Sequence, residues 1–213
     1  KNTGAVAPGY KADLLILDDL DKVIVRDVYK NGEKVVSDGK TLCFDMPKIN
    51  DALEKKVRSS FNLPMLSSSD FAVDYNGKRK CHVISLVDGQ LLTDDLVSDI
   101  DFDCNNGIDI EHDILKIAVI ERHHNTGHIG NAFIKGIGLK EGAIASSVAH
   151  DSHNLIVIGT NTDDMAFAAN RIRELGGGIV SVKNGQVVAE MPLPIGGLMS
   201  CETAERAAEE NEK

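Results

Sequence analysis

Two short polar clusters contain the residue types in this chain that are suited to chemistry. Residues 121–124 read Glu-Arg-His-His and directly follow the apolar run Ile114–Ile120. Residues 150–154 read His-Asp-Ser-His-Asn and lie between the apolar runs 143–148 and 155–158. Histidine beside a carboxylate suits general acid–base catalysis, or a metal with nitrogen and oxygen ligands. The chain therefore carries candidate catalytic side chains at the ends of buried segments.

The second cluster is predicted to be a loop or bulge that joins two buried strands. In one extended strand His150 and His153, three residues apart, would point to opposite faces of the sheet, so they converge only if the chain turns. If the strands that end in the two clusters are neighbours, a carboxylate and several imidazoles share one rim of a sheet. The alternative is a purely structural loop in which Asp151 caps backbone amides and the histidines make ordinary polar contacts.

Self-contained catalytic motifs are missing around these clusters. The spacing of His150 and His153 lacks the glutamate-bearing helix of a zinc protease, and Ser152 lacks a GxSxG nucleophile elbow. The glycines at 136, 138 and 142 do not have dinucleotide-binding spacing, and the HxE and PCxxC elements of zinc-dependent nucleobase deaminases are absent.

Composition excludes several classes of partner. The 213 residues are 42% hydrophobic, which is enough for a core, and the formal net charge is −10, which disfavours nucleic acid and anionic membrane as partners. No apolar run approaches the roughly 18 residues of a membrane span, and no signal-peptide pattern opens the chain, so we expect a cytoplasmic protein. The four cysteines have no CxxC pair and are predicted to be free thiols.

The elements that must position the clusters form an α+β pattern. Residues 1–45 read as β structure with a hairpin at Asn31-Gly32, and residues 49–61 as an amphipathic helix. The serine-rich stretch 67–70 is predicted to be a linker and a domain boundary. Beyond it we expect strands at residues 71–75, 81–87, 91–97, 114–120, 143–148 and 155–158, and a hairpin at residues 179–189. The acidic stretch 94–113 is predicted to be a solvated loop, and residues 127–138 a short glycine-punctuated helix. Residues 161–175 are expected to form a helix capped from Asn161, and residues 201–213 a charged helix that stops without a cap.

The N-terminal region resembles the β-sandwich that follows the catalytic barrel in amidohydrolase-superfamily enzymes. The resemblance rests on residues 4–17 (GAVAPGYKADLLIL), residues 28–36 (VYKNGEKVV) and Gly39. It implies a structural segment rather than a catalytic one.

The remaining sequence is similar to the C-terminal region of bacterial adenine deaminases. The matching segments are residues 119–123 (VIERH), 133–139 (FIKGIGL), 142–154 (GAIASSVAHDSHN), 158–161 (IGTN), 176–178 (GGG) and 192–197 (PLPIGG). Together the two resemblances imply an α+β chain: part of an amidohydrolase β-sandwich with a connecting helix at residues 1–65, then a mixed α/β C-terminal domain at residues 70–213.

In the intact enzyme the resemblance implies hydrolysis of adenine to hypoxanthine and ammonia, a purine-salvage reaction that uses a divalent metal, namely manganese, iron or zinc. Such enzymes hold the metal in a (β/α)-barrel with an HxH pair, and no HxH occurs among the seven histidines here. The first residue is Lys1 rather than Met, so we expect the barrel upstream of it and assign no metal ligand to this chain. The isolated chain is predicted to be inactive. The expected partners are adenine, the upstream barrel and further copies in a homo-oligomer.

We hypothesise that the polar clusters face the barrel mouth, where they move protons or bind the purine edge. The candidate catalytic residues are Glu121, His123, His150, Asp151 and His153, and the candidate substrate-binding residues are Ser152 and Asn154. Two alternatives remain open: a non-catalytic scaffold or oligomerisation module, and an amidohydrolase acting on another cyclic amide or aminopurine.

Overall fold

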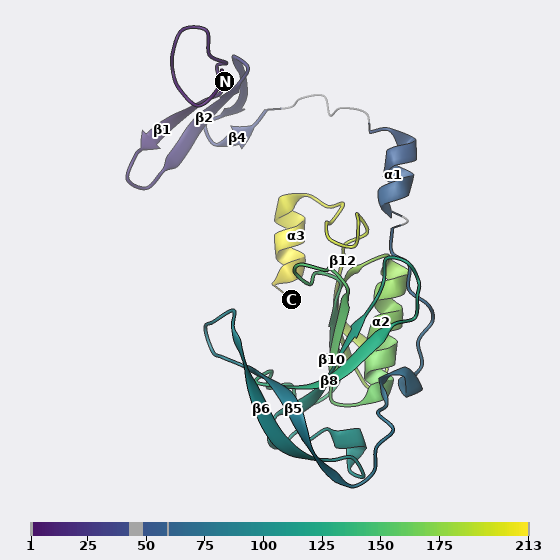
Figure 1. Ribbon diagram of the computed structural model, residues 1–213. Helices are drawn as coiled ribbons and strands as arrows, with labels where there is room; N and C mark the ends of the chain where they lie inside the picture. Colours follow the sequence, from purple (N-terminus) through teal and green to yellow (C-terminus); the bar gives the residue numbers. More distant parts are fainter. Residues whose placement is uncertain (1, 43–48, 59, 213) are drawn as a thin grey trace. The chain divides into compact units, whose positions relative to one another are not determined.

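The computed structural model describes residues 2–42, 49–58 and 60–212, and the chain divides into two compact units, Lys1–Ile49 and Asn50–Lys213 (Figure 1). The described ranges contain three α-helices and twelve strands in two sheets. The predicted α+β class is therefore confirmed.

The first unit is a four-stranded antiparallel sheet in the order β1-β2-β3-β4. Its strands are β1 (Leu14–Asp19), β2 (Ile24–Lys30), β3 (Glu33–Ser37) and β4 (Lys40–Thr41). The predicted hairpin at Asn31-Gly32 is confirmed, with φ of 50° and 85° at its two central residues, as tight two-residue turns between twisted strands require.

This sheet buries no apolar side chain within the described part of its own unit. Asp27 is the one buried residue there, while Leu15 and Ile24 are 58% and 49% exposed. Burial of apolar surface is the main driving force of folding, so a sheet of this kind needs a covering layer. That is the property expected of one part of a larger sandwich.

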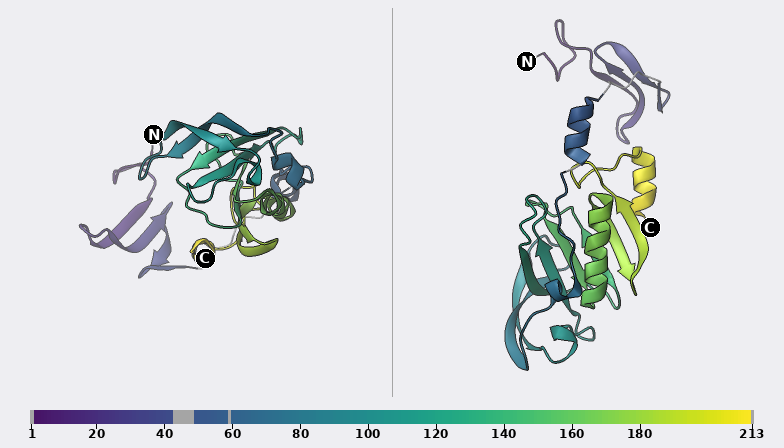
Figure 2. Two further views of the ribbon diagram at one scale, coloured as in Figure 1. Left: turned by 90° about the horizontal axis from the view of Figure 1, so that it is seen from below. Right: turned by 90° about the vertical axis from the view of Figure 1, so that its right-hand side faces the viewer.

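The second unit is built on an eight-stranded sheet in the order β12-β11-β9-β10-β7-β8-β5-β6, with one helix along one face (Figure 2). Every neighbouring pair is antiparallel except β5 and β8, which are parallel. The strands are β5 (Lys78–Leu86), β6 (Thr93–Asp101), β7 (Ile114–Ile120), β8 (Ile129–Lys135), β9 (Ala143–Ser146), β10 (Leu155–Gly159), β11 (Gly178–Lys183) and β12 (Gln186–Pro192).

The covering helix is α2 (Thr162–Leu175), and both of its ends follow from the sequence. The side chain of Asn161 accepts a hydrogen bond from the amide of Asp164 at 2.7 Å, and Gly176 ends the helix at φ 73°. Met165 and Ile172 are fully buried and belong to the same core cluster as the inward-facing residues of β7 and β10. The predicted helix is confirmed.

The segment before β5 belongs to the core of the second unit. The predicted amphipathic helix is confirmed as α1 (Asp51–Arg58), although none of its residues is buried. Leu63, Leu66 and Phe71 are each 7% exposed or less and lie in the α2 cluster. The chain therefore divides between Ile49 and Asn50, and the serine-rich stretch that we predicted to be a linker lies inside the second unit.

Three local predictions were wrong. Residues 71–75 are not a strand, because Ser67 and Asp70 form a capping box that starts the 3₁₀ turn η1 (Ser68–Phe71). Residues 127–138 contain β8 instead of a helix, since hydrogen bonding to β7 and β5 on its two sides decides the conformation. The acidic stretch 94–113 is not simply a solvated loop, because its first half belongs to the edge strand β6.

The C-terminal helical pattern is confirmed as α3 (Ala204–Asn211), and at its N-terminal end the side chain of Thr203 accepts a hydrogen bond from the amide of Arg206.

Candidate functional site

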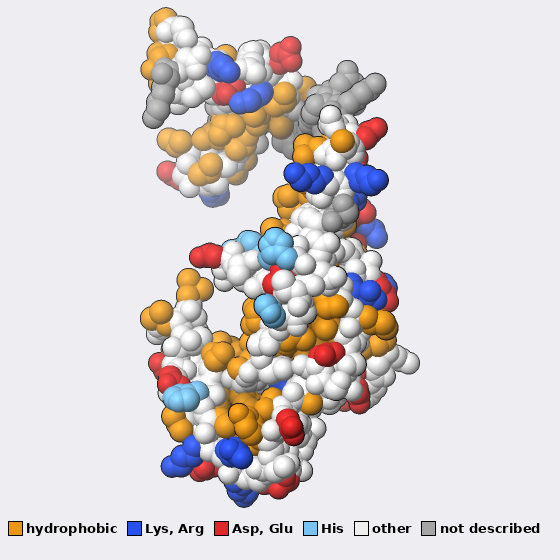
Figure 3. Space-filling view, turned by 45° about the vertical axis from the view of Figure 1, so that its right-hand side comes forward, with side chains coloured by type: hydrophobic (Ala, Val, Ile, Leu, Met, Phe, Trp, Pro, Cys, Tyr) orange, Lys and Arg blue, Asp and Glu red, His pale blue; other side chains and the backbone are white. Residues whose placement is uncertain are grey.

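The two polar clusters lie side by side at one rim of the large sheet. Strands β7 and β10 are antiparallel neighbours, and Ile120, the last residue of β7, pairs with Leu155, the first residue of β10. The loop 121–128 therefore starts where the loop 147–154 ends. In the space-filling view histidine side chains gather on one part of this unit (Figure 3). The condition under which the two clusters share one rim, namely that their strands are neighbours, is therefore met.

Glu121 holds the first loop in its shape. One carboxylate oxygen accepts hydrogen bonds from the amides of His123 (2.5 Å) and His124 (2.8 Å), and the other from the amide and the hydroxyl of Thr126 (3.1 and 2.9 Å). Desolvation opposes ionisation of this carboxyl group, but the four hydrogen bonds outweigh it and lower the pKa of Glu121 to about 2. The carboxylate is thus ionised and fully engaged with its own loop.

His123 ties the two loops together. Its Nε2 atom lies 2.9 Å from the carbonyl oxygen of Ser152, and its own carbonyl accepts a hydrogen bond from the side chain of Asn62 at 2.9 Å. Three segments distant in sequence therefore meet at this imidazole.

His150 and His153 converge, as the predicted turn requires. Their ring centroids are 5.2 Å apart in an edge-to-face arrangement. The amide of His153 donates to the carbonyl of Ala149 at 2.6 Å, and His153 itself has φ 49°. His150, Asp151 and Ser152 are exposed, while His153 and Asn154 are half-buried. The turn brings two imidazoles into contact and leaves one of them open to solvent.

Two buried polar atoms in this loop have no hydrogen-bond partner among the residues that the structure describes. They are Nδ1 of His153 and Oδ1 of Asn154. Buried polar atoms are nearly always paired, because an unpaired one costs about 1–3 kcal/mol. Both atoms are enclosed by the chain, and neither is paired within the described residues.

Arg122 is a residue of the rim that sequence reasoning passed over. Its side chain is 2% exposed, its Nε donates to the carbonyl oxygen of His153 at 2.6 Å, and its guanidinium carbon lies 4.9 Å from the centre of the Phe61 ring. The available signal was its position in the polar cluster that follows β7, two residues beyond Ile120.

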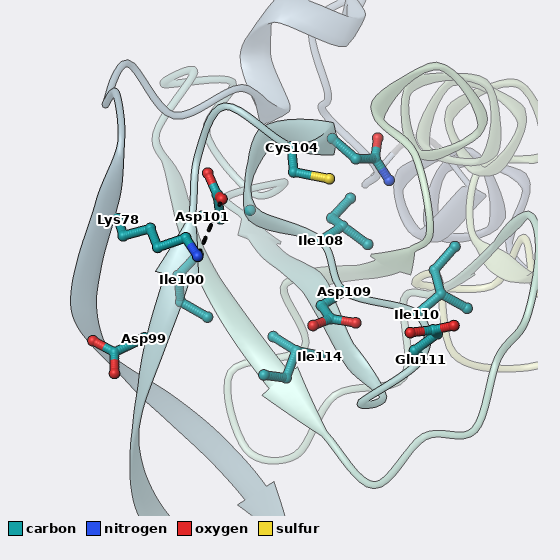
Figure 4. A pocket seen from close by; sticks show the side chains of 12 residues that line it. Lys78, Asp99, Ile100, Asp101, Cys104, Ile108, Asp109, Ile110, Glu111 and Ile114 are labelled. Atoms are coloured by element: carbon teal, nitrogen blue, oxygen red, sulfur yellow. Dashed lines mark ion pairs between the residues drawn. The ribbon is translucent and has the colours of Figure 1, made fainter.

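A separate pocket of about 570 Å³ lies between the β5–β6 pair and the segment 104–111 (Figure 4). Isoleucine side chains and several carboxylates line it, and Lys78 forms a 3.9 Å ion pair with Asp101 at its edge. None of the seven predicted site residues lines this pocket. It is therefore not part of the predicted site.

Within residues 2–42, 49–58 and 60–212, no three histidine, cysteine, aspartate or glutamate side chains are arranged to hold a metal ion. The described residues thus do not fit the metal that the family resemblance implies. The helices of the described part of the chain are all too short or too polar to cross a membrane.

These features define an α+β domain with a histidine-rich loop rim on a mainly antiparallel sheet. A model of the adenine deaminase C-terminal domain matches residues 90–213, and the chain belongs to this family.

Curated relatives named adenine deaminase extend the similarity over nearly the whole chain. The protein of Lysinibacillus sphaericus is 41% identical over 97% of this chain, and that of Petrotoga mobilis is 43% identical over 97%. The protein of Brucella anthropi is 42% identical over 95%. The chain covers 35%, 36% and 35% of these three proteins, so it spans about a third of their length.

Proposed function

We propose that this chain is the C-terminal portion of an adenine deaminase, which hydrolyses adenine to hypoxanthine and ammonia. The observation that supports it most directly is the shared rim, where the imidazoles of His150 and His153 lie 5.2 Å apart and where Nδ1 of His153 and Oδ1 of Asn154 have no partner among the described residues. The family membership and the relatives' names point to the same reaction.

The reaction requires proton transfers that this rim is equipped to make. Water adds to C6 of the purine, the bond from C6 to the exocyclic nitrogen breaks, one proton goes to ring N1, and another leaves with the amine as ammonia. Imidazole accepts and donates protons near neutral pH, and Asp151 supplies a carboxylate in the same loop. In this proposal His150, Asp151 and His153 exchange these protons.

The remaining rim residues are proposed to bind the purine or to hold the loops in place. Ser152 and Asn154 are proposed to contact the purine edge, with the unpaired Oδ1 of Asn154 accepting a hydrogen bond from the substrate. His123 and Glu121 are proposed to act from the adjoining loop, where Glu121 fixes the backbone and adds a permanent negative charge.

The water-activating metal is assigned to another part of the enzyme, because the described residues do not fit it. A divalent metal supplies a hydroxide near neutral pH by lowering the pKa of bound water. We propose manganese, iron or zinc in an upstream barrel, in a cytoplasmic homo-oligomer that serves purine salvage. Metal analysis of the full-length enzyme and its mass in solution check these points.

The test uses the full-length enzyme with His150→Ala and His153→Ala. We expect kcat for adenine to fall by about 10²- to 10⁴-fold, as loss of a general acid or base does. His82→Ala is the matched control, because His82 is exposed on β5, pairs with Asp95 at 2.7 Å and lies outside the rim. Normal turnover in both rim variants would refute the catalytic assignment. The isolated 213-residue chain is expected to show no turnover.

A scaffold role is the second candidate, and the internal hydrogen bonds of Glu121 and His123 favour it. A domain that only supports the barrel or builds the oligomer predicts rim variants with normal kcat but altered subunit assembly. Profiling other aminopurines and cyclic amides separates adenine deamination from the reaction of a related amidohydrolase.

A further inference from the structure

Arg122 lies directly beneath the catalytic loop proposed above. Its guanidinium donates through Nε to the carbonyl oxygen of His153 and lies over the face of the Phe61 ring. On another side it meets Gly197: a Cβ atom built on that glycine would lie 2.8 Å from Nη1. The backbone of Gly197 is fixed in turn, because the buried hydroxyl of Ser147 donates to its carbonyl at 2.6 Å. The guanidinium is thus enclosed by an aromatic ring and a backbone segment.

No carboxylate of the described residues forms an ion pair with Arg122, although its side chain is 98% removed from solvent. A buried charge without a counterion costs stability, and arginine cannot escape this cost by losing its proton. An apolar residue would fill the same space at lower cost. The cation is therefore difficult to explain as a packing residue.

We propose that Arg122 is the positioning residue of the site and that it acts through His153. Two hydrogen bonds hold the backbone of His153: its amide donates to Ala149, and its carbonyl accepts from Arg122. With both ends of the residue held and φ at 49°, the position of Cβ is set, and this places the imidazole whose Nδ1 has no hydrogen-bond partner among the described residues. This inference rests on the proposed function, because it assumes that His153 takes part in turnover.

A double-mutant cycle in the full-length enzyme tests this role. The variants are Arg122→Met, which keeps the bulk and removes the donors, Arg122→Lys, which keeps a cationic donor, His153→Ala, and Arg122→Met with His153→Ala. We expect Arg122→Met to lower kcat by about 10- to 100-fold, as a small displacement of a catalytic group does, with KM within about twofold of the wild type. Arg122→Lys should recover part of this loss.

The decisive result is the absence of any further loss in the double variant relative to His153→Ala alone. A residue that merely supports the fold would lower kcat by the same factor in both backgrounds, and that outcome would overturn the inference. Lys116→Met is the matched control, because it removes an equally buried cation from β7, the strand that precedes the Arg122 loop, without touching the rim, and it should leave kcat unchanged.

The outcomes separate this inference from the proposed function. If His153→Ala alone turns over normally, the proposed function fails first. If His153→Ala is impaired but Arg122→Met is not, only the positioning role fails. Should Arg122→Met not fold, Arg122→Lys in the two His153 backgrounds gives the same comparison, and equal losses in both again contradict the inference.

Discussion

The two buried cations associated with β7, Lys116 and Arg122, show how differently one protein treats an internal positive charge. Lys116 is fully buried, its ammonium contacts Oδ1 of Asn106, and it lies 5.9 Å from the centre of the Phe133 ring. Arg122 contacts a loop carbonyl instead and lies next to the histidines. Burial lowers the pKa of both, that of Lys116 to about 8.

The difference indicates which of the two buried charges belongs to the candidate site. Lysine can lose its proton when it is buried, whereas arginine stays charged in any protein environment. The neighbourhood of Lys116 is internally satisfied, because Asn106 also exchanges hydrogen bonds with the backbone of Val73. The neighbourhood of Arg122 contains the unpaired polar atoms of His153 and Asn154. The permanent cation therefore supports the rim, and the titratable one lies within the core.

The largest expected effect on stability comes from Arg122→Ala. The change removes a buried side chain and leaves the carbonyl of His153 without its donor, so we expect a loss of about 3–4 kcal/mol in the free energy of unfolding. Urea unfolding measures it. A loss below about 1 kcal/mol would contradict the close packing of the guanidinium between Phe61 and Gly197.

Lys116→Met should instead raise the free energy of unfolding near neutral pH. The folded pKa of about 8 lies below the unfolded value of about 10.4, so the burial penalty is complete below pH 8 and disappears as the pH rises toward 10.4. The wild type should therefore gain up to about 3 kcal/mol relative to Lys116→Met across this window. Paired unfolding curves at pH 7 and 10 test it, and a constant difference would show that Lys116 does not titrate differently on folding.

Gly197→Ala should lower the free energy of unfolding by less than Arg122→Ala does, and it tests only the contact between Gly197 and Arg122. The added methyl group would lie 2.8 Å from Nη1 of Arg122, and Gly197 has φ 73°, a region that alanine avoids. We expect about 1–2 kcal/mol of destabilisation. Gly185→Ala is the control for backbone strain, since its φ is 68° and nothing lies within 4 Å of its added Cβ. Equal losses in the two variants would argue against close contact with Arg122.

Glu121→Gln should have the smallest effect on global stability and a distinct pH signature. Because the folded pKa is about 2, below the unfolded value, the carboxylate stabilises the loop above about pH 4.3 and loses this contribution as the pH falls toward 2. Protection of the His123, His124 and Thr126 amides, measured against the exchange rate of an unstructured peptide at the same pH, should fall over that range in the wild type. The variant should exchange faster already at pH 7 and respond less to acid.

Local sequence signals predicted the elements whose ends are encoded nearby. Asn161 and Gly176 delimit α2 by capping at both ends, and Asn31-Gly32 sets the first hairpin. Residues 127–138 could not be predicted in this way, because their apolar residues suit either a helix or a strand until β7 and β5 supply hydrogen-bond partners. The role of the segment around Phe71 was missed for the same reason, since its burial depends on α2.

For the candidate site, the sequence by itself determined that two polar clusters follow buried strands and that the chain must turn at His150 if its imidazole is to meet that of His153. It also determined the family, because several segments, residues 142–154 among them, are similar to the C-terminal region of adenine deaminases. Only the tertiary structure decided that β7 and β10 are neighbours, that the Glu121 carboxylate accepts hydrogen bonds from its own loop, and that Arg122 donates to the carbonyl of His153. The physical reason is range: turns and caps depend on neighbours a few residues away, whereas pairing of strands and burial of a charge depend on residues about thirty positions apart, as Arg122 and His153 are.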